Sequence, residues 1–376
     1  MKTLAVFSIF DRDGIIDKYI LYWLEKLKTV SEKLITVVNG PIKEVSMQEL
    51  KKYCSEIICR ENVGYDAGAY KDVLLKYLGR KEIEQYDSLI LCNDTCYGPF
   101  GKLQDIICCL SQYDIGGLKY QDRGCISWMD AFFLFFNKRV LCDDAFYEYW
   151  EKEIDSSEKD IINVYFSFES SLTNLYTEKG WKIGTYSQSE NYNICGASGV
   201  CVQRGLPVLK KKAFSDRYFN EENIIFSLIE IRKTDYDIGL IRENVIRCFG
   251  KDIDKYMRDL NDPQNVLWMK DEISSVTRAD VEHFIEENSG RDLYIYGAGI
   301  IAGRVFVTYM EKQEHFKGFL VTKLEEKRTF LGYALQEASD IVGRENIAII
   351  VGMNRKNTAS VRNFLDKKKS EILYLW

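Results

Sequence analysis

The chain has 376 residues, of which 46% are hydrophobic and 29% are charged. This composition supports one large or a few ordinary folded domains and excludes a disordered protein. The formal net charge of -6 lacks the basic footprint that general nucleic-acid binding needs. Only two histidines are present, His283 and His315, which argues against multi-histidine metal sites and against a Ser-His-Asp triad.

The eleven cysteines form no C-x-x-C pair and no zinc-type spacing, which indicates reduced thiols in a cytoplasmic protein. The apolar stretch after Lys2 ends at Asp11 without a cleavage site, so we expect no signal peptide. No apolar run approaches the roughly 20 residues that span a bilayer. Lysine runs at 210–212 and 367–369 are interpreted either as solvated charges or as a peripheral contact with an anionic membrane at its inner face.

Short apolar runs alternate with helix-period segments in the first part of the chain, which is typical of βα units around a parallel sheet. Strands are predicted at 4–9, 34–38, 56–59, 88–92, 115–118 and 132–136. Helices are predicted at 16–27, 67–78, 144–153 and 169–179.

Beyond residue 220 the pattern becomes helical and heavily charged, and a new strand begins at Asp292. Apolar runs at 316–321 and 347–351 complete a small α/β unit. We therefore predict an α/β protein with a first domain at 1–219, a helical connector at 220–290 and a Rossmann-like domain at 291–376.

Two polar loops follow predicted strands. Asp66 lies between Gly64 and Gly68 where a strand gives way to a helix, the position at which open α/β sheets bind ligands. The alternative is a helix cap, with the glycines serving only the turn. Asp94 ends a buried strand and can hold Mg²⁺ or Mn²⁺, although Asn-Asp-Thr is also ordinary turn chemistry. Tyr97 is expected either to stack on a sugar or base or to pack in the core.

Several motifs, taken together and in this order, resemble the rhamnan synthesis protein F family. They are Phe10-Asp11-x-Asp13-Gly14, Val38-Asn39-Gly40, Asn62-x-Gly64-x-Asp66-x-Gly68 and Asn93-Asp94-Thr95-x-Tyr97-Gly98-Pro99-Phe100. The resemblance continues collinearly to about residue 245. Members of this family are glycosyltransferase-like proteins of bacterial surface polysaccharide assembly.

The resemblance implies a GT-A (Rossmann-like) fold and a nucleotide-diphosphate sugar donor, a dTDP- or UDP-sugar. The sugar, typically rhamnose or another deoxyhexose, would be transferred to a glycan or lipid-linked acceptor of a capsule, cell-wall or O-antigen polysaccharide. A homo-oligomer and other polysaccharide-synthesis enzymes are the further partners considered.

The resemblance also implies roles for individual residues. The donor-binding set is Asp11, Asp13, Asn39, Asn62, Gly64, Asp66, Asn93, Asp94 and Tyr97. Asp94 would occupy the place of a metal-binding Asp-x-Asp, but the chain supplies only one carboxylate there. Metal dependence therefore stays open, and neighbouring lysines or arginines are the alternative stabilisers of the leaving diphosphate.

An inverting transfer needs a base that deprotonates the acceptor hydroxyl. Both histidines follow residue 280, so a carboxylate is expected. By analogy with other inverting enzymes of this fold we predict Glu169, with Asp130 as the second choice. The alternative for Glu169 is a first-turn carboxylate that the helix dipole favours.

The C-terminal Gly297-x-Gly299-x-x-Ala302 matches a dinucleotide-binding fingerprint, but Val321-Thr322-Lys323 after the next strand supplies no acidic ribose ligand. The glycines of this segment serve either to bind a nucleotide or to let the helix pack closely on the strand. Two other functions stay in view: a non-catalytic glycan-assembly scaffold and, with less support, an NAD(P)-dependent oxidoreductase.

Overall fold

The computed structural model describes residues 1–254, 274–324, 328–367 and 370–376. Part of the predicted connector, and the lysines at 368 and 369, lie outside these residues. The chain divides into two compact units, each described here by itself. Within the described residues, unit 1 consists of Met1–Gln121, Met129–Val164 and Leu175–Asp271, and unit 2 of Asp122–Trp128, Tyr165–Asn174 and Glu272–Trp376.

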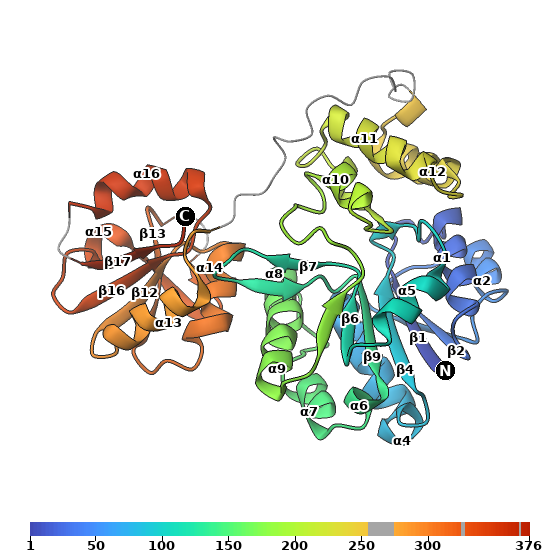
Figure 1. Cartoon of the computed structure of the whole chain (residues 1–376), viewed down its shortest axis with the longest axis horizontal. Helices are drawn as coiled ribbons and strands as arrows, with labels where there is room; N and C mark the ends of the chain where they lie inside the picture. Colours follow the sequence, from blue (N-terminus) through green and yellow to red (C-terminus); the bar gives the residue numbers. More distant parts are fainter. Residues whose placement is uncertain (255–273, 325–327, 368–369) are drawn as a thin grey trace. The chain divides into compact units, whose positions relative to one another are not determined.

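Unit 1 is built on a seven-stranded sheet (Figure 1). In spatial order its strands are β10 (Ile183–Thr185), β6 (Ile115–Gly117), β9 (Phe133–Asn137), β4 (Ser88–Asn93), β1 (Thr3–Ile9), β2 (Lys33–Asn39) and β3 (Glu56–Arg60). The four strands from β4 to β3 are parallel, whereas β9 runs antiparallel to both of its neighbours. β1 and β4 are buried along their whole length, which explains their continuous apolar sequences.

All six strands predicted for the first domain are present in this sheet. The sequence did not show that β9 is antiparallel, because a fully buried strand reads as the same apolar run in either direction. The edge strand β10 escaped prediction because its three residues are only half-buried and carry no alternating pattern. The α/β class is confirmed.

Helices accompany the sheet of unit 1, with two π-helical turns, η1 and η2, and a 3-10 turn, η3. They are α1 (Lys18–Lys28), α2 (Glu44–Leu50), α3 (Tyr65–Lys71), η1 (Asp72–Leu78), α4 (Arg80–Ile83), α5 (Leu103–Leu110), α6 (Lys138–Leu141), α7 (Asp144–Lys152), α8 (Ile161–Tyr165), η2 (Phe166–Ser170), α9 (Ser171–Lys179), α10 (Ser198–Gln203), η3 (Lys211–Phe214), α11 (Glu221–Arg232) and α12 (Ile238–Phe249). Residues 165–174 of this run are counted with unit 2.

Helix α1 shows how the apolar spacing produces the core. Tyr19, Ile20, Trp23, Leu24 and Leu27 recur three or four residues apart and are all buried. They join the largest hydrophobic cluster of the unit, together with residues of β1 and β4.

Two short two-stranded ladders complete the strands up to residue 210. β5 (Cys96–Tyr97) pairs antiparallel with β11 (Leu209–Lys210), and β7 (Tyr120–Asp122) pairs with β8 (Ser127–Met129). The first ladder brings the segment around residue 210 back to the turn that follows β4.

Unit 2 contains a six-stranded sheet whose central strand is β12. In spatial order the strands are β14 (Thr329–Phe330), β15 (Tyr333–Glu337), β13 (Phe316–Val321), β12 (Asp292–Tyr296), β16 (Ile347–Val351) and β17 (Glu371–Tyr374). Its helices are α13 (Arg278–Glu287), α14 (Ile300–Val305), the π-helical turn η6 (Phe306–Met310), α15 (Ala338–Ile341) and α16 (Arg355–Leu365). β15 and β17 lack a continuous apolar run because they are only partly buried, and the sequence did not predict them.

The two units do not follow the sequence in simple blocks. Residues 122–128 and 165–174 belong to unit 2, although they fall inside the predicted first domain. Helices α11 and α12, which were assigned to a connector, are counted with unit 1. The boundaries at 219 and 290 stay predictions.

No helix within the described ranges combines the length and the apolar character that a membrane crossing requires. All eleven cysteines are described and are free thiols.

Replacing Gly303 by Ala is expected to lower the melting temperature of the protein. Gly303 lies in α14, and a β-carbon there would overlap the ring of Phe166 in the same unit. Overpacking of this kind costs about 1–3 kcal/mol. The matched control is Gly290→Ala, because nothing lies within 4 Å of a β-carbon at that position. Calorimetry of the two variants checks this, and equal melting temperatures would contradict the packing.

Candidate active site

The candidate site lies at the carboxyl ends of β1 and β4. The chain proceeds from β1 to β2 and β3 on one side and then returns to β4 on the other side of β1. Neighbouring strands whose connections leave in opposite directions form a topological switch point, where open α/β sheets bind ligands. Asp11 follows β1, Asn93 ends β4 and Asp94 follows it, so polar residues meet at this point.

The Asn93 side chain joins the two loops that the sequence singled out. Its amide nitrogen donates to Asp66 Oδ2 at 2.6 Å, and its oxygen accepts from the amide and the hydroxyl of Thr95 at 3.2 and 2.5 Å. Asp66 Oδ1 accepts from the amide of Ala67 at 2.9 Å. Burial raises the pKa of Asp66, and the hydrogen bond from Asn93 acts in the opposite direction.

Asp94 is held by a lysine and a tyrosine. Its side chain is almost fully buried, and Oδ2 accepts from Lys211 Nζ at 3.1 Å. The Tyr19 hydroxyl accepts from Lys211 Nζ at 2.7 Å and donates to the Asp94 carbonyl at 2.9 Å. Burial, followed by the charge of Asp94, raises the pKa of Tyr19 well above its usual range. Burial alone would lower the pKa of Lys211, but Asp94 outweighs it and the net shift is upward, so the lysine stays protonated.

The lysines reach this turn through the β5–β11 ladder. Lys210 lies opposite Cys96, and the Lys211 amide donates to the Thr95 carbonyl at 2.9 Å. Lys210 Nζ donates to Thr95 Oγ1 at 2.8 Å. In the sequence these lysines form only a charged run, because their partners lie more than 100 residues away in the chain.

The loop from β1 to α1 carries an acidic cluster closed by Arg247 of α12. Asp11 Oδ1 accepts from the amides of Asp13 and Ile15 at 2.9 and 3.0 Å. Arg247 bridges Asp11 Oδ2, at 2.5 Å, and Asp17, whose Oδ1 it reaches at 3.1 Å. Burial alone would raise the pKa of Asp11, but the hydrogen bond and charge of Arg247 and the two amides lower it. Arg247 is the second functional candidate that sequence reasoning missed.

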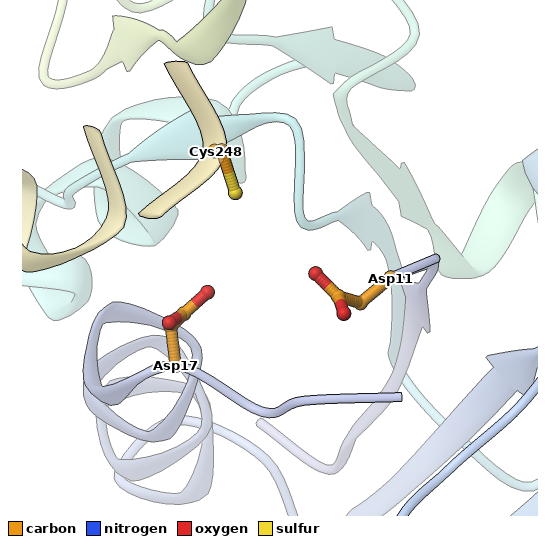
Figure 2. Close-up of side chains that lie close together, drawn as sticks. All are labelled: Asp11, Asp17 and Cys248. Atoms are coloured by element: carbon orange, nitrogen blue, oxygen red, sulfur yellow. The ribbon is translucent and has the colours of Figure 1, made fainter. Parts of the chain in front are cut away.

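The arrangement does not fit a metal ion at Asp94. A dication there would lie near the Lys211 ammonium, which already balances the single carboxylate of the turn. Both oxygens of Asp66 accept hydrogen bonds from the protein. Asp11, Asp17 and Cys248 have ligand atoms within 4.8 Å of one another, and Figure 2 shows the three side chains around a common space. There, Arg247 pairs with both carboxylates and offsets one of their two negative charges.

Two further residues of the predicted donor-binding set, Asn39 and Gly64, have structural explanations. Asn39 donates to Ser8 Oγ at 2.8 Å and accepts from Arg60 at 2.9 Å, which ties the ends of β1, β2 and β3. Gly64 has a φ of +64°, and a β-carbon there would lie 2.7 Å from the Ser156 carbonyl oxygen.

Tyr97 is fully buried and donates to Asn244 Oδ1 at 2.6 Å, whereas Asp13 is exposed and lies 3.5 Å from Arg247. Asn62 is half-buried in the loop before α3. The direct donor contacts of these residues stay predictions.

The two candidate bases fall in different units. Asp130 follows β8, belongs to unit 1 and is nearly buried, and its Oδ2 accepts from Gln121 Nε2 at 3.1 Å. Glu169 lies in the π-helical turn η2 of unit 2, and its Oε2 accepts from Arg304 at 2.7 Å. This ion pair gives Glu169 a structural role within unit 2.

Unit 2 has its own switch point, between β12 and β16. Gly297 follows β12 with a φ of +129°, and a β-carbon there would lie 2.9 Å from the Gly352 carbonyl oxygen. A β-carbon at Gly352 would in turn lie 3.0 Å from the Cα of Ala302. Close packing therefore accounts for Gly297 and Ala302, whereas nothing lies within 4 Å of a β-carbon at Gly299.

A family model described as rhamnan synthesis protein F matches residues 34–293, more than two thirds of the chain. The chain belongs to this family. The resemblance noted in the sequence is thereby confirmed, and the observed sheet of unit 1 agrees with the GT-A type that the family implies.

A curated relative, the uncharacterized protein y4gN of Sinorhizobium fredii, is 30% identical over 193 residues. The match covers 50% of this chain and 49% of the relative, so the chain spans about half the length of the curated relative it matches.

Solved structures resemble the chain only distantly. The glycosyltransferase GlyE of Streptococcus pneumoniae is 12% identical, with 97% of this chain and 99% of that one covered and a TM-score of 0.38. A putative nucleotide-diphospho-sugar transferase from Desulfovibrio desulfuricans is 13% identical over 49% of this chain and 80% of that one, with a TM-score of 0.27. At these TM-scores the likenesses carry no functional argument.

Replacing Arg247 by Gln is expected to lower the free energy of unfolding at pH 7 by about 2 kcal/mol, because two partly buried carboxylates lose their shared cation. Since the folded-state pKa of Asp11 is lowered, its contribution is complete above the unfolded value of 3.8 and is lost as the pH falls through the lowered value. The variant and the wild type should therefore begin to converge in urea unfolding below about pH 4 and should coincide only below the lowered pKa of Asp11.

Arg242→Gln is the control for this measurement. Arg242 is on the same helix and pairs with Asp254 at 2.7 Å, but both side chains are exposed. A change of at most about 1 kcal/mol is expected. Equal losses for the two variants, or a difference for Arg247→Gln that does not depend on pH, would show that the acidic cluster does not depend on Arg247.

Proposed function

We propose that the protein is a glycosyltransferase of bacterial surface polysaccharide synthesis that takes its sugar from a nucleotide-diphosphate donor. The observation that carries this proposal is the group of charged side chains at the β1–β4 switch point, where Asp66, Asp94 and Lys211 lie around one turn. Membership of the rhamnan synthesis protein F family supports it. The finer part of the proposal is a dTDP- or UDP-linked rhamnose or other deoxyhexose and a glycan or lipid-linked acceptor.

The chemistry needs the protein to orient the donor and to accept a proton. The switch point would bind and orient the donor, with its nucleoside towards the Asp11 loop and its diphosphate towards the turn after β4. The acceptor hydroxyl oxygen would attack the anomeric carbon while the bond from that carbon to the diphosphate oxygen breaks. The hydroxyl proton would pass to a carboxylate, and the nucleoside diphosphate would leave with the electron pair of the broken bond.

We assign the base to Asp130 in preference to Glu169. Asp130 belongs to the same unit as Asp66 and Asp94, whereas the carboxylate of Glu169 is already paired with Arg304. The Lys210 ammonium lies 4.5 Å from the ring centre of Phe132, two residues after Asp130, which supports a place for the segment of Asp130 near the turn. Location at the inner face of the membrane and assembly with other synthesis enzymes remain parts of this proposal.

Ligand-induced thermal stabilisation tests the function itself. We expect a dTDP-, UDP- or GDP-sugar to raise the melting temperature and to be hydrolysed slowly to the nucleoside diphosphate. Stabilisation by NAD(H) alone would instead support an oxidoreductase. Binding of a nucleotide-sugar without hydrolysis or transfer to any acceptor would support a scaffold.

Replacing Asp130 by Asn is expected to lower kcat for donor hydrolysis about 10²- to 10⁴-fold and to leave the donor KM nearly unchanged, because only proton transfer is lost. Steady-state release of nucleoside diphosphate measures both constants. Asp105→Asn, on the exposed face of α5, is the control. If Glu169→Gln abolished donor hydrolysis and Asp130→Asn left kcat unchanged, the base would be Glu169.

A further inference from the structure

We propose that Lys210 and Lys211 bind the donor diphosphate in place of a divalent cation, so that donor binding and sugar transfer do not require a metal. This inference rests on the proposed function, since it concerns the same donor. It follows from the poor fit of the turn after β4 to a metal ion and from the two lysines that the fold delivers to that turn.

The two lysines are held by backbone pairing. Lys210 is the last residue of β11, and its ladder with β5 fixes it opposite Cys96. The amide of Lys211 continues the pairing to the Thr95 carbonyl. Two consecutive ammonium groups are therefore brought to Asp94 and Thr95, which follow β4. On an unstructured surface, by contrast, like charges would keep two such lysine side chains apart.

Each ammonium group is oriented by a different contact. Lys211 Nζ lies 3.1 Å from Asp94 Oδ2 and 2.7 Å from the Tyr19 hydroxyl. Lys210 Nζ lies 2.8 Å from Thr95 Oγ1 and over the ring of Phe132. Asp94 and Tyr19 thus act as positioning residues for Lys211, and Thr95 and Phe132 act in the same way for Lys210.

The charges at the turn suit a diphosphate. Lys211 is paired with Asp94, and the charge of Lys210 acts on Asp66, so both lysines act at this turn. The raised pKa of Lys211 keeps this lysine protonated throughout the neutral range. An ammonium group has three N–H donors, and Asp94 and Tyr19 engage two of those of Lys211. The third can be directed to a phosphate oxygen, where the positive charge favours the charge that develops on the leaving diphosphate. This is the electrostatic task that a divalent cation performs in a metal-dependent transferase.

Titration calorimetry of UDP, dTDP and GDP, each with Mn²⁺ or with excess EDTA, tests the inference. We expect at least one of them to bind with a Kd that differs less than about threefold between the two conditions, a difference of only about 0.7 kcal/mol. We also expect the corresponding nucleotide-sugar to be hydrolysed in EDTA.

Lys211→Met should weaken binding of that nucleoside diphosphate about 10- to 100-fold, the effect of losing a hydrogen bond to a charged group. Lys211→Met should also reduce the preference for the diphosphate over the monophosphate. Lys211→Arg should restore much of this preference. Lys210→Met should weaken binding in the same direction. Lys212→Met, which changes the exposed third lysine of the run, is the matched control and should bind like the wild type.

Removing Lys211 alone leaves Asp94 buried without its cation, and that variant can fail to fold. The double variant Asp94→Asn with Lys211→Met removes both charges together. A double variant that has a normal melting temperature and still binds the diphosphate weakly in EDTA supports a direct role of Lys211. Wild-type affinity in that variant overturns it.

The outcomes separate the two proposals. Binding and hydrolysis that occur only with Mn²⁺ overturn the lysine proposal and leave the transferase function standing. No binding of any nucleoside diphosphate or nucleotide-sugar in either condition overturns the function and the lysine proposal with it.

Discussion

The candidate site of unit 1 depends on the buried ion pair between Lys211 and Asp94. A buried carboxylate without a cation costs several kcal/mol, so the segment that carries Lys211 is held at the end of β4. The pair also anchors the Tyr19 hydroxyl, which links helix α1 to the same turn. One interaction therefore connects the central sheet, its first helix and the chain 117 residues further on.

The same principle of shared charge appears in the loop after β1. Arg247 pairs with both Asp11 and Asp17, so α12 is attached to the edge of the sheet where the strands end. Both ion-pair systems bring elements from beyond residue 200 to the first strands. The switch point is thus lined by cations that come from outside the loop motifs of the first strands. Its electrostatic potential therefore differs from that of a cluster of carboxylates alone.

Several features of the fold and site were predictable because they are local. The strands that end at Ile9 and Asn93 are continuous apolar runs, and the polar residues that follow them mark the carboxyl edge of a parallel sheet. The proximity of Asp66 to Asn93 follows from the same edge of the sheet. The role of Gly64 was harder to predict, since a glycine required by the approach of Ser156 and one required by a ligand look identical in sequence.

The sequence by itself determined the α/β class, the main strands and the two loops that gather Asp66 and Asp94, because these follow from the spacing of apolar residues and from turn chemistry. Only the tertiary structure decided that Lys211 pairs with Asp94, that Arg247 closes the acidic loop and that Glu169 pairs with Arg304. The residues next to a charged residue in the sequence do not show which residue it will pair with. Its partner is selected when folding removes both charges from water, whatever their separation along the chain.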